Sequence, residues 1–201
     1  MVLTAVAAVS ASAAGFSHKW HLAMELACEK CHTAVRGSTK ASDNLLPSPT
    51  VCRECHSEGQ PVRSAPTLQF VAKFNHALHL KMGNVAPVIA GAIDKGTYLS
   101  APGNVRAQLN SRNPCEGCHR GLRESDGVTK TNFPAMADCL VCHNQIDVPF
   151  SCTKCHLETQ PLRPPTHSPD FLDVHSSGRM KLDKTTCAVC HGRRFTCQGC
   201  H

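Results

Sequence analysis

The sequence predicts a mostly irregular chain with short α-helices and little β-structure, packed around bound prosthetic groups rather than around its own side chains. The chain has 201 residues, of which 14 are Cys and 13 are His, but only nine are aromatic. Leu, Ile, Val and Phe make up roughly a fifth of it, which is near the limit for building a core from side chains alone. No apolar run is long enough to span a bilayer and no heptad repeat is present, so a membrane bundle and a coiled coil are poor fits.

All 14 cysteines lie in C-x-x-C pairs, and a histidine directly follows each pair. The cysteines are Cys28, Cys31, Cys52, Cys55, Cys115, Cys118, Cys139, Cys142, Cys152, Cys155, Cys187, Cys190, Cys197 and Cys200, and the histidines are His32, His56, His119, His143, His156, His191 and His201. C-x-x-C-H is typical of covalent haem c attachment, in which both thiols form thioethers to one porphyrin and the histidine is the proximal iron ligand. Zinc knuckles and disulfide-rich domains also use paired cysteines, but neither requires a histidine after each pair. We therefore expect seven covalently bound haem c groups.

Seven haems would leave about 29 residues for each, so we expect the porphyrins to form the core and the polypeptide to wrap them. The polypeptide carries a formal net charge of +6. Each haem adds two propionates that outweigh the charge left on its iron, so the loaded protein should carry roughly −1 when ferric and roughly −8 when ferrous. No nucleic-acid partner is therefore expected.

The first residues indicate export. Residues 1–14 are small and apolar, and Ala11-Ser12-Ala13 resembles the cleavage site at the end of a signal peptide. No Lys or Arg precedes this run, which departs from the usual basic start, and an ordinary helix of the mature protein is the alternative. Since haem c is assembled outside the cytoplasmic membrane, both features favour a periplasmic or extracellular protein.

Six histidines remain after the proximal set, and we expect them to bind irons from the opposite side. They are His18, His21, His76, His79, His167 and His175. Four of them occur in an F-x-H-x-x-H pattern that begins at Phe16 and again at Phe74. Histidines three residues apart share one helical face, and their rings can diverge enough to reach different irons, with the phenylalanine packing on a porphyrin.

The stretch 16–32 resembles the opening of class III multihaem cytochromes, the cytochrome c3 and c7 group. This resemblance implies that the first histidine of each pair binds the haem that follows and that the second crosses to another haem. The assignments implied are His18 for the haem of His32, His76 for that of His119, and crossing roles for His21 and His79.

The C-terminal stretch 167–201 is similar to segments of larger multihaem cytochromes of metal-respiring bacteria. This second resemblance suggests His175 as the distal ligand for the haem of His191, with a crossing role for His167. It also brings a filament-forming cytochrome into consideration.

A repeated segment indicates a modular build. Residues 55–63 read CHSEGQPVR and residues 155–163 read CHLETQPLR, and each closes a group of C-x-x-C-H segments. The expected parts of one continuous haem-cored domain are a two-haem module at 16–63, a three-haem module at 74–156 and a two-haem module at 167–201. Residues 80–114 contain neither Cys nor His, and we expect them to form a surface loop or small hairpin inserted in the second module.

Six distal histidines cannot serve seven irons, and three explanations are open. A methionine could supply the seventh ligand, and the candidates are Met24, Met82, Met136 and Met180. A neighbouring subunit could donate a histidine. Alternatively, one iron could stay five-coordinate and bind a small molecule.

These features predict an electron-transfer protein rather than an enzyme, with closely spaced, mostly bis-His haems of low potential. Anaerobic respiration or extracellular electron transfer would suit it, as a relay or as a nanowire-type subunit. The expected partners are other redox proteins or extracellular metal acceptors, and self-association into a polymer would supply the seventh ligand. The alternative function is a small multihaem reductase with one open haem, although the sequence contains no C-x-x-C-K segment of the nitrite-reductase type.

Overall fold

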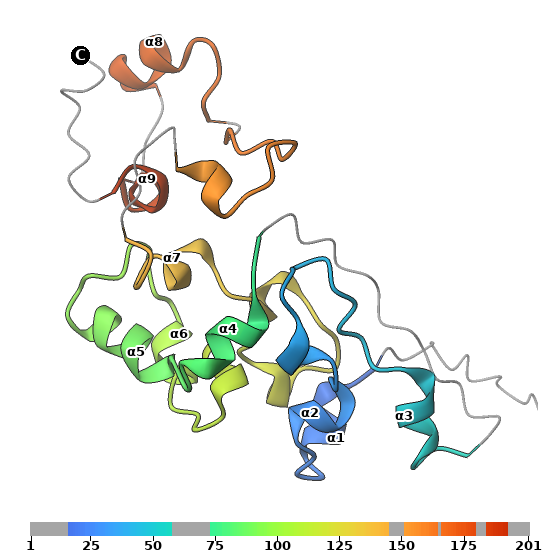
Figure 1. Ribbon diagram of the computed structural model, residues 1–201. Helices are drawn as coiled ribbons and strands as arrows, with labels where there is room; N and C mark the ends of the chain where they lie inside the picture. The colour runs from blue at the N-terminus through green and yellow to red at the C-terminus, as the bar shows by residue number, and fades with distance from the viewer. Residues whose placement is uncertain (1–15, 58–72, 145–150, 165, 180–183, 193–201) are drawn as a thin grey trace, which may run out of the picture.

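The structure is a computed structural model, and it describes residues 16–57, 73–144, 151–164, 166–179 and 184–192. Within these ranges the chain forms short helices joined by turns and irregular loops, and its β-structure is limited to one bridge position at His156 (Figure 1). The predicted fold class of short α-helices with little β-structure is therefore confirmed. The predicted leader, residues 1–14, and the last C-x-x-C-H segment lie outside the described residues.

The described residues contain nine α-helices and five 3-10 helices. The α-helices are α1 (His18–Leu22), α2 (Cys28–Cys31), α3 (Pro49–Arg53), α4 (His76–Lys81), α5 (Ala86–Asp94), α6 (Val105–Gln108), α7 (Met136–Cys139), α8 (Phe171–Ser176) and α9 (Lys184–His191). The 3-10 helices are η1 (Val35–Gly37), η2 (Pro114–Gly117), η3 (Leu122–Glu124), η4 (Lys130–Asn132) and η5 (Cys152–Lys154). Within the described ranges, no helix has the length and apolar character needed to cross a membrane.

Polar caps fix where the histidine-bearing helices begin. The Ser17 hydroxyl accepts a hydrogen bond from the Trp20 N–H at the start of α1. The Asn75 side-chain oxygen accepts one from the Leu78 N–H, at 2.8 Å, at the start of α4. Such caps satisfy backbone donors that have no partner inside the helix. Each helix therefore begins directly at its first histidine.

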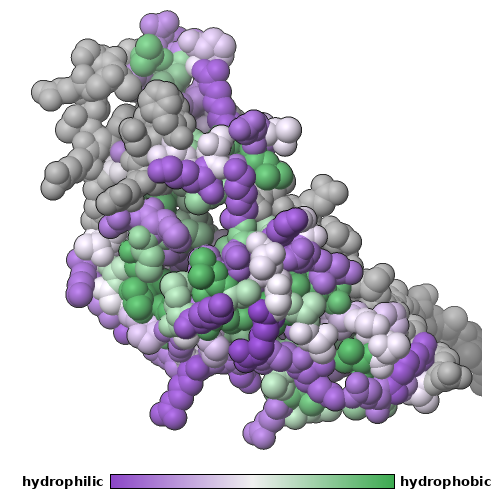
Figure 2. Space-filling model, viewed as in Figure 1, coloured by the Kyte–Doolittle hydropathy of each residue, from purple (hydrophilic) through white to green (hydrophobic). Residues whose placement is uncertain are grey.

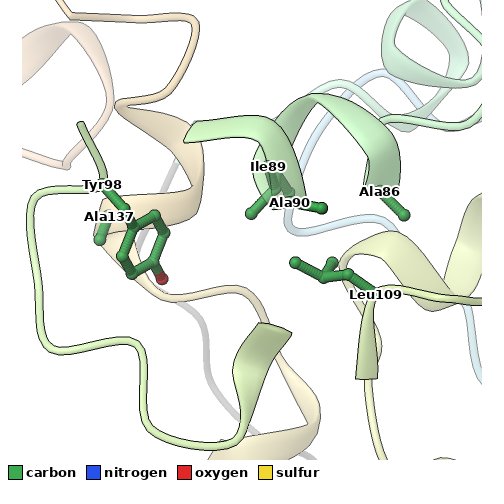
Figure 3. Close-up of a cluster of buried hydrophobic side chains, with 6 residues drawn as sticks. All are labelled: Ala86, Ile89, Ala90, Tyr98, Leu109 and Ala137. Carbon is green, nitrogen blue, oxygen red and sulfur yellow. The ribbon is translucent and has the colours of Figure 1, made fainter. Parts of the chain in front are cut away.

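The segment 80–114 is helical, so the expectation of a surface loop or hairpin was wrong. It contains α5 and α6 and supplies most of a small buried cluster (Figure 3). The members are Ala86, Ile89, Ala90, Tyr98, Leu109 and Ala137. Apolar residues at 86, 89, 90 and 93 have the spacing of one helical face. Gly96, which reads as loop punctuation in the sequence, has a φ of +66° just after α5 and ends that helix.

A buried ion pair joins this cluster to α7. Arg120 donates to Asp138 Oδ2 at 2.6 Å, and the two side chains are only 3% and 2% exposed. The Tyr98 hydroxyl donates to Asp138 Oδ1 at 3.0 Å, and burial, followed by the Asp138 charge, raises the pKa of Tyr98. Buried charges need partners. This network therefore joins Arg120, which follows the third C-x-x-C-H segment, to Asp138, which precedes the fourth.

The N-terminal helices pack against the middle of the chain. In Figure 1, α1, α2 and α3 lie together, α4 to α7 form the neighbouring group, and α8 and α9 lie beyond it. The Lys19 N–H donates to the Ser125 carbonyl where α1 meets η3, and the Ala77 N–H donates to the Ser38 carbonyl where α4 meets η1. Both helices that carry an H-x-x-H pair are thus anchored to a distant part of the sequence.

Part of the apolar surface lies uncovered by polypeptide. Figure 2 shows apolar side chains gathered over α4 and α5. Leu78 in α4 and Met82 directly after it are each 59% exposed, and Val88 in α5 is 51% exposed. The polypeptide alone therefore leaves large apolar side chains open around a histidine-bearing helix.

Replacing Asp138 should strongly destabilise the fold. Asp138→Asn leaves the buried Arg120 guanidinium without a counter-charge, so we expect the free energy of unfolding in guanidinium chloride to fall by about 3 kcal/mol or more. The matched control is Asp94→Asn, which removes the exposed ion pair between Arg106 and Asp94 and should leave the unfolding curve nearly unchanged. Equal unfolding curves for the two variants would contradict the structural role of the buried pair.

Candidate functional site

Each C-x-x-C-H segment from the first to the fifth folds as one tight turn. The histidine N–H donates to the carbonyl of the first cysteine at 2.8–2.9 Å. These bonds join His32 to Cys28, His56 to Cys52, His119 to Cys115, His143 to Cys139 and His156 to Cys152. The sixth segment lies in α9. No disulfide joins two of the twelve cysteines within the described residues.

Five imidazoles that follow a cysteine pair each face a second imidazole from elsewhere in the chain. The pairs and their ring-centroid separations are His18 with His32 (6.4 Å), His21 with His56 (6.0 Å), His76 with His119 (6.5 Å), His79 with His143 (6.2 Å) and His167 with His191 (6.1 Å). Three pairs are nearly parallel, with interplanar angles of 4–11°, and those of His21 and His79 are tilted by 43° and 48°.

These separations fit one metal ion between two imidazoles. A metal–imidazole bond is about 2 Å long and the ring centroid lies about 1 Å behind the bonding nitrogen, so two rings on opposite sides of one metal have centroids roughly 6 Å apart. Rings in direct van der Waals contact would be much closer. With four equatorial nitrogens from a porphyrin, each pair would complete a six-coordinate iron. The geometry therefore fits the haem that the sequence predicts.

The two F-x-H-x-x-H segments adopt nearly the same geometry. Phe16 lies edge-on to His18 and stacks on His21 with centroids 4.3 Å apart. Phe74 lies edge-on to His76 and stacks on His79, also at 4.3 Å. Each phenylalanine thus sets the angle between two imidazoles that face different C-x-x-C-H segments.

Most of the paired imidazoles are oriented by a bond to Nδ1. On the distal side, His21 Nδ1 donates to the Ser17 carbonyl and His79 Nδ1 to the Asn75 carbonyl, both at 2.8 Å. On the proximal side, His32 Nδ1 donates to the Leu45 carbonyl at 2.7 Å, and His119 Nδ1 bonds the Asn132 carbonyl at 3.1 Å. Such bonds fix the tautomer and leave Nε2 as the nitrogen free to bind a metal.

Burial keeps several of these imidazoles neutral. The pKa of His18 is lowered to about 4, mainly by burial and further by the nearby His32. Burial also lowers the pKa of His76 and of His119. His18 Nδ1 is buried without a hydrogen-bond partner in the described chain. A neutral imidazole is the form that binds a metal, so these environments suit ligands.

The C-terminal pairing differs from the sequence expectation. His167, rather than His175, faces His191, with an interplanar angle of 4°. Phe171 lies between the two histidines and stacks on both, with centroids 5.0 Å from His167 and 4.7 Å from His175. His18, His76 and His167 are the first histidines of the three groups of distal candidates. Each of them therefore faces the histidine of the next C-x-x-C-H segment along the chain. The expectation came from the resemblance of residues 167–201 to larger multihaem cytochromes, which placed His175 rather than His167 opposite His191.

Among the described residues, no second imidazole faces His156. His175 Nδ1 donates to the Phe171 carbonyl at 2.7 Å, in the manner of the other distal histidines. His156 Nδ1 donates to Gln160 Oε1 at 3.0 Å. Of the methionines considered as ligands, Met24 and Met82 are exposed, Met136 is half-buried, and Met180 lies outside the described residues.

The first C-x-x-C-H segment lies close to two others. The Cys28 and Cys115 thiols are hydrogen-bonded to each other, which lowers the pKa of Cys28 to about 6 and raises that of Cys115. Asn113 also donates to Cys28 Sγ at 3.5 Å. Burial raises the pKa of Cys31, and the nearby Cys52 thiol raises it further. The first segment therefore lies between the second and the third.

The later segments form a series. The pKa of Cys139 is raised to about 11, by burial first, and Cys118 and Cys155 contribute to the increase. Burial raises the pKa of Cys190, and Cys152 adds to it. Since charges influence one another mainly within about 10 Å, consecutive segments from the third to the sixth are neighbours in space.

A cavity of about 910 Å³ lies beside the third segment. Asn132 and Phe133 line it, and these residues also contact His119, through the Asn132 carbonyl and the Phe133 ring at 5.3 Å. Arg120 and Arg123 belong to the same lining. The volume is typical of sites for organic cofactors, although Arg120 is already ion-paired with Asp138 and Arg123 with Glu116.

Sequence reasoning missed the groups that orient the imidazoles. The backbone carbonyls of Leu45 and Asn132 leave no trace in a motif, because any residue can supply a carbonyl. Gln160 could have been found, since the repeat places Gln60 and Gln160 each four residues after a C-x-x-C-H histidine.

Residues 21–201 match the family described as outer membrane cytochrome MtrC/MtrF-like, domains II/IV. The matched range includes all seven C-x-x-C-H segments. No curated protein and no solved structure matches the chain.

Removing the cap of α4 should loosen one histidine pair. Asn75→Ala deletes the side-chain acceptor for the Leu78 N–H, so we expect α4 to lose about 1 kcal/mol of stability and its amides to exchange faster with deuterium. Asn104→Ala is the control, because Asn104 precedes α6 without a capping side-chain bond. If both variants exchange alike in their own helices, the cap does not hold α4.

Proposed function

The chain belongs to the outer membrane cytochrome MtrC/MtrF-like family, and we propose that it is an electron-transfer protein with seven covalently bound haem c groups. Six irons would have two histidine ligands each. The proposed ligand pairs are the five facing pairs described above together with His175 and His201.

The facing imidazoles are the observation that carries this proposal. A C-x-x-C-H segment alone predicts attachment, but it says nothing about the other side of the iron. Five of the C-x-x-C-H histidines each face another imidazole, with ring centroids 6.0–6.5 Å apart. Bis-histidine ligation of one iron requires this separation. Two imidazole ligands give low-spin iron of low potential.

A haem supplies a one-electron ferric–ferrous couple when it is bound. The polypeptide's part is to keep the imidazoles in place, so that the ligands do not rearrange when the charge changes. The carbonyls of Ser17 and Asn75 hold two distal rings, and those of Leu45 and Asn132 hold two proximal rings. Porphyrin faces would also cover apolar side chains such as Leu78, which the polypeptide leaves exposed.

Contacts between segments support a continuous path whose order differs from the order in sequence. The Lys30–Glu54 ion pair joins the first two segments, and the Cys28–Cys115 contact joins the first to the third. The electrostatic influences of Cys118 and Cys155 on Cys139, and of Cys152 on Cys190, extend the series. Named by proximal histidine, the proposed order is His56, His32, His119, His143, His156 and His191. One end of the path would therefore lie at the second segment.

The description of the family also bears on location and partners. It names outer membrane cytochromes, so we propose that this chain is exported and exchanges electrons with other redox proteins or with extracellular acceptors. The expected overall charge, roughly −1 to −8 with seven haems, would favour basic partner surfaces.

Counting haem tests the cofactor directly. A haemochrome assay, combined with the intact mass of the purified full chain, should give seven haems per chain. Heating in denaturant with a chelator should release none of them, because thioether bonds survive unfolding. Release of the cofactor, or a bound metal in place of haem, would overturn the proposal.

Replacing one distal ligand should change the reduction potential of one haem. His76→Met places a thioether opposite His119, so we expect about one seventh of the redox titration to move to higher potential while the haem count stays the same. Met82→Leu is the control, because the Met82 side chain is 59% exposed in the same region and is not a ligand in this account. A shift caused by Met82→Leu, or none caused by His76→Met, would contradict the ligand assignment.

A further inference from the structure

We propose that the haem attached at Cys152 and Cys155 has no distal histidine from this chain, and that its iron binds small exogenous ligands such as carbon monoxide. This inference rests on the proposed function, since it requires a haem at each C-x-x-C-H segment. It identifies the one iron of the seven that lacks a second histidine ligand.

Elimination gives the first argument. Five proximal histidines already face a distal imidazole, which leaves His156 and His201. One distal candidate, His175, remains for these two positions.

The order of pairing gives the second argument. In the first two groups, the first histidine faces the next C-x-x-C-H segment and the second histidine faces the one after it. His167 follows the same rule by facing His191. The rule therefore assigns His175 to His201, and His156 is left without a distal histidine.

The surroundings of His156 agree with this assignment. Its ring Nδ1 bonds Gln160, and among the described residues no imidazole or phenyl ring faces it. The adjoining Thr153, Lys154 and Cys155 are all exposed, so a small molecule could reach a haem held there.

Gln160 supplies the hydrogen-bond acceptor for the proximal imidazole at this position. At His32 and His119, backbone carbonyls accept the Nδ1 hydrogen, whereas at His156 a side-chain amide does so. An acceptor at Nδ1 makes the imidazole a stronger donor and favours ferric iron. A substitution can remove this acceptor without touching an iron ligand.

Carbon monoxide titration of the reduced full chain is the first test. With the haems counted on the same sample, we expect one carbon monoxide per seven haems, and one high-spin iron in seven by EPR of the oxidised protein. Seven haems that bind no carbon monoxide would overturn this inference and leave the electron-transfer proposal standing. Two or more binding sites would overturn it as well. Fewer than seven covalent haems would instead count against the proposed function.

A pair of variants locates the binding site. Cys152→Ala with Cys155→Ala should remove one haem and all carbon monoxide binding. The matched control, Cys52→Ala with Cys55→Ala, should also remove one haem but keep the binding. Carbon monoxide binding that survives loss of the haem at Cys152 and Cys155 would overturn the assignment.

A gentler pair serves if the cysteine variants do not accumulate. Gln160→Leu should raise the reduction potential of the haem that binds carbon monoxide, because the proximal N–H loses its acceptor. Gln60→Leu, at the matching position of the repeat, should leave that potential unchanged. If Gln160→Leu has no effect on the binding haem, that haem is not the one at His156.

Discussion

Two imidazoles facing each other across about 6 Å are the constraint on which the rest of this chain depends. A C-x-x-C-H turn supplies one ring of each pair locally, whereas the other ring comes from a distant part of the sequence. The contacts that anchor α1 against η3 and α4 against η1 therefore position ligands as well as holding the fold. This explains why such short helices have well-defined caps and are fixed to remote segments.

The same constraint accounts for the small protein core. Among the described residues only a few apolar side chains are buried, around α5, and the Arg120–Asp138 pair ties that cluster to the third and fourth C-x-x-C-H segments. Elsewhere large apolar side chains stay exposed, as expected of a polypeptide that shares its core with cofactors. The spatial order of the segments also differs from their sequence order, because the first segment lies between the second and the third.

The sequence alone predicted the fold class, and residue type and spacing singled out all of the candidate ligands. Covalent attachment needs a local motif, so Cys28, Cys31 and His32 can be recognised without a structure. Pairing partners depend on tertiary packing, so the motif alone could not supply them. The resemblance implied His18 with His32 and His76 with His119, which the structure brings face to face, but it placed His175 rather than His167 opposite His191. The helix α5 was missed because its glycines suggested a loop, although its apolar spacing was already helical.

An iron should lie between the two imidazoles of each facing pair. A crystal structure of the haem-loaded full chain, with an anomalous map at the iron edge, would locate the irons. We expect one iron peak midway between the rings of each of the five pairs, from His18 with His32 to His167 with His191, and porphyrin density around each. Iron peaks away from these midpoints, or pairs with no iron between them, would contradict this expectation.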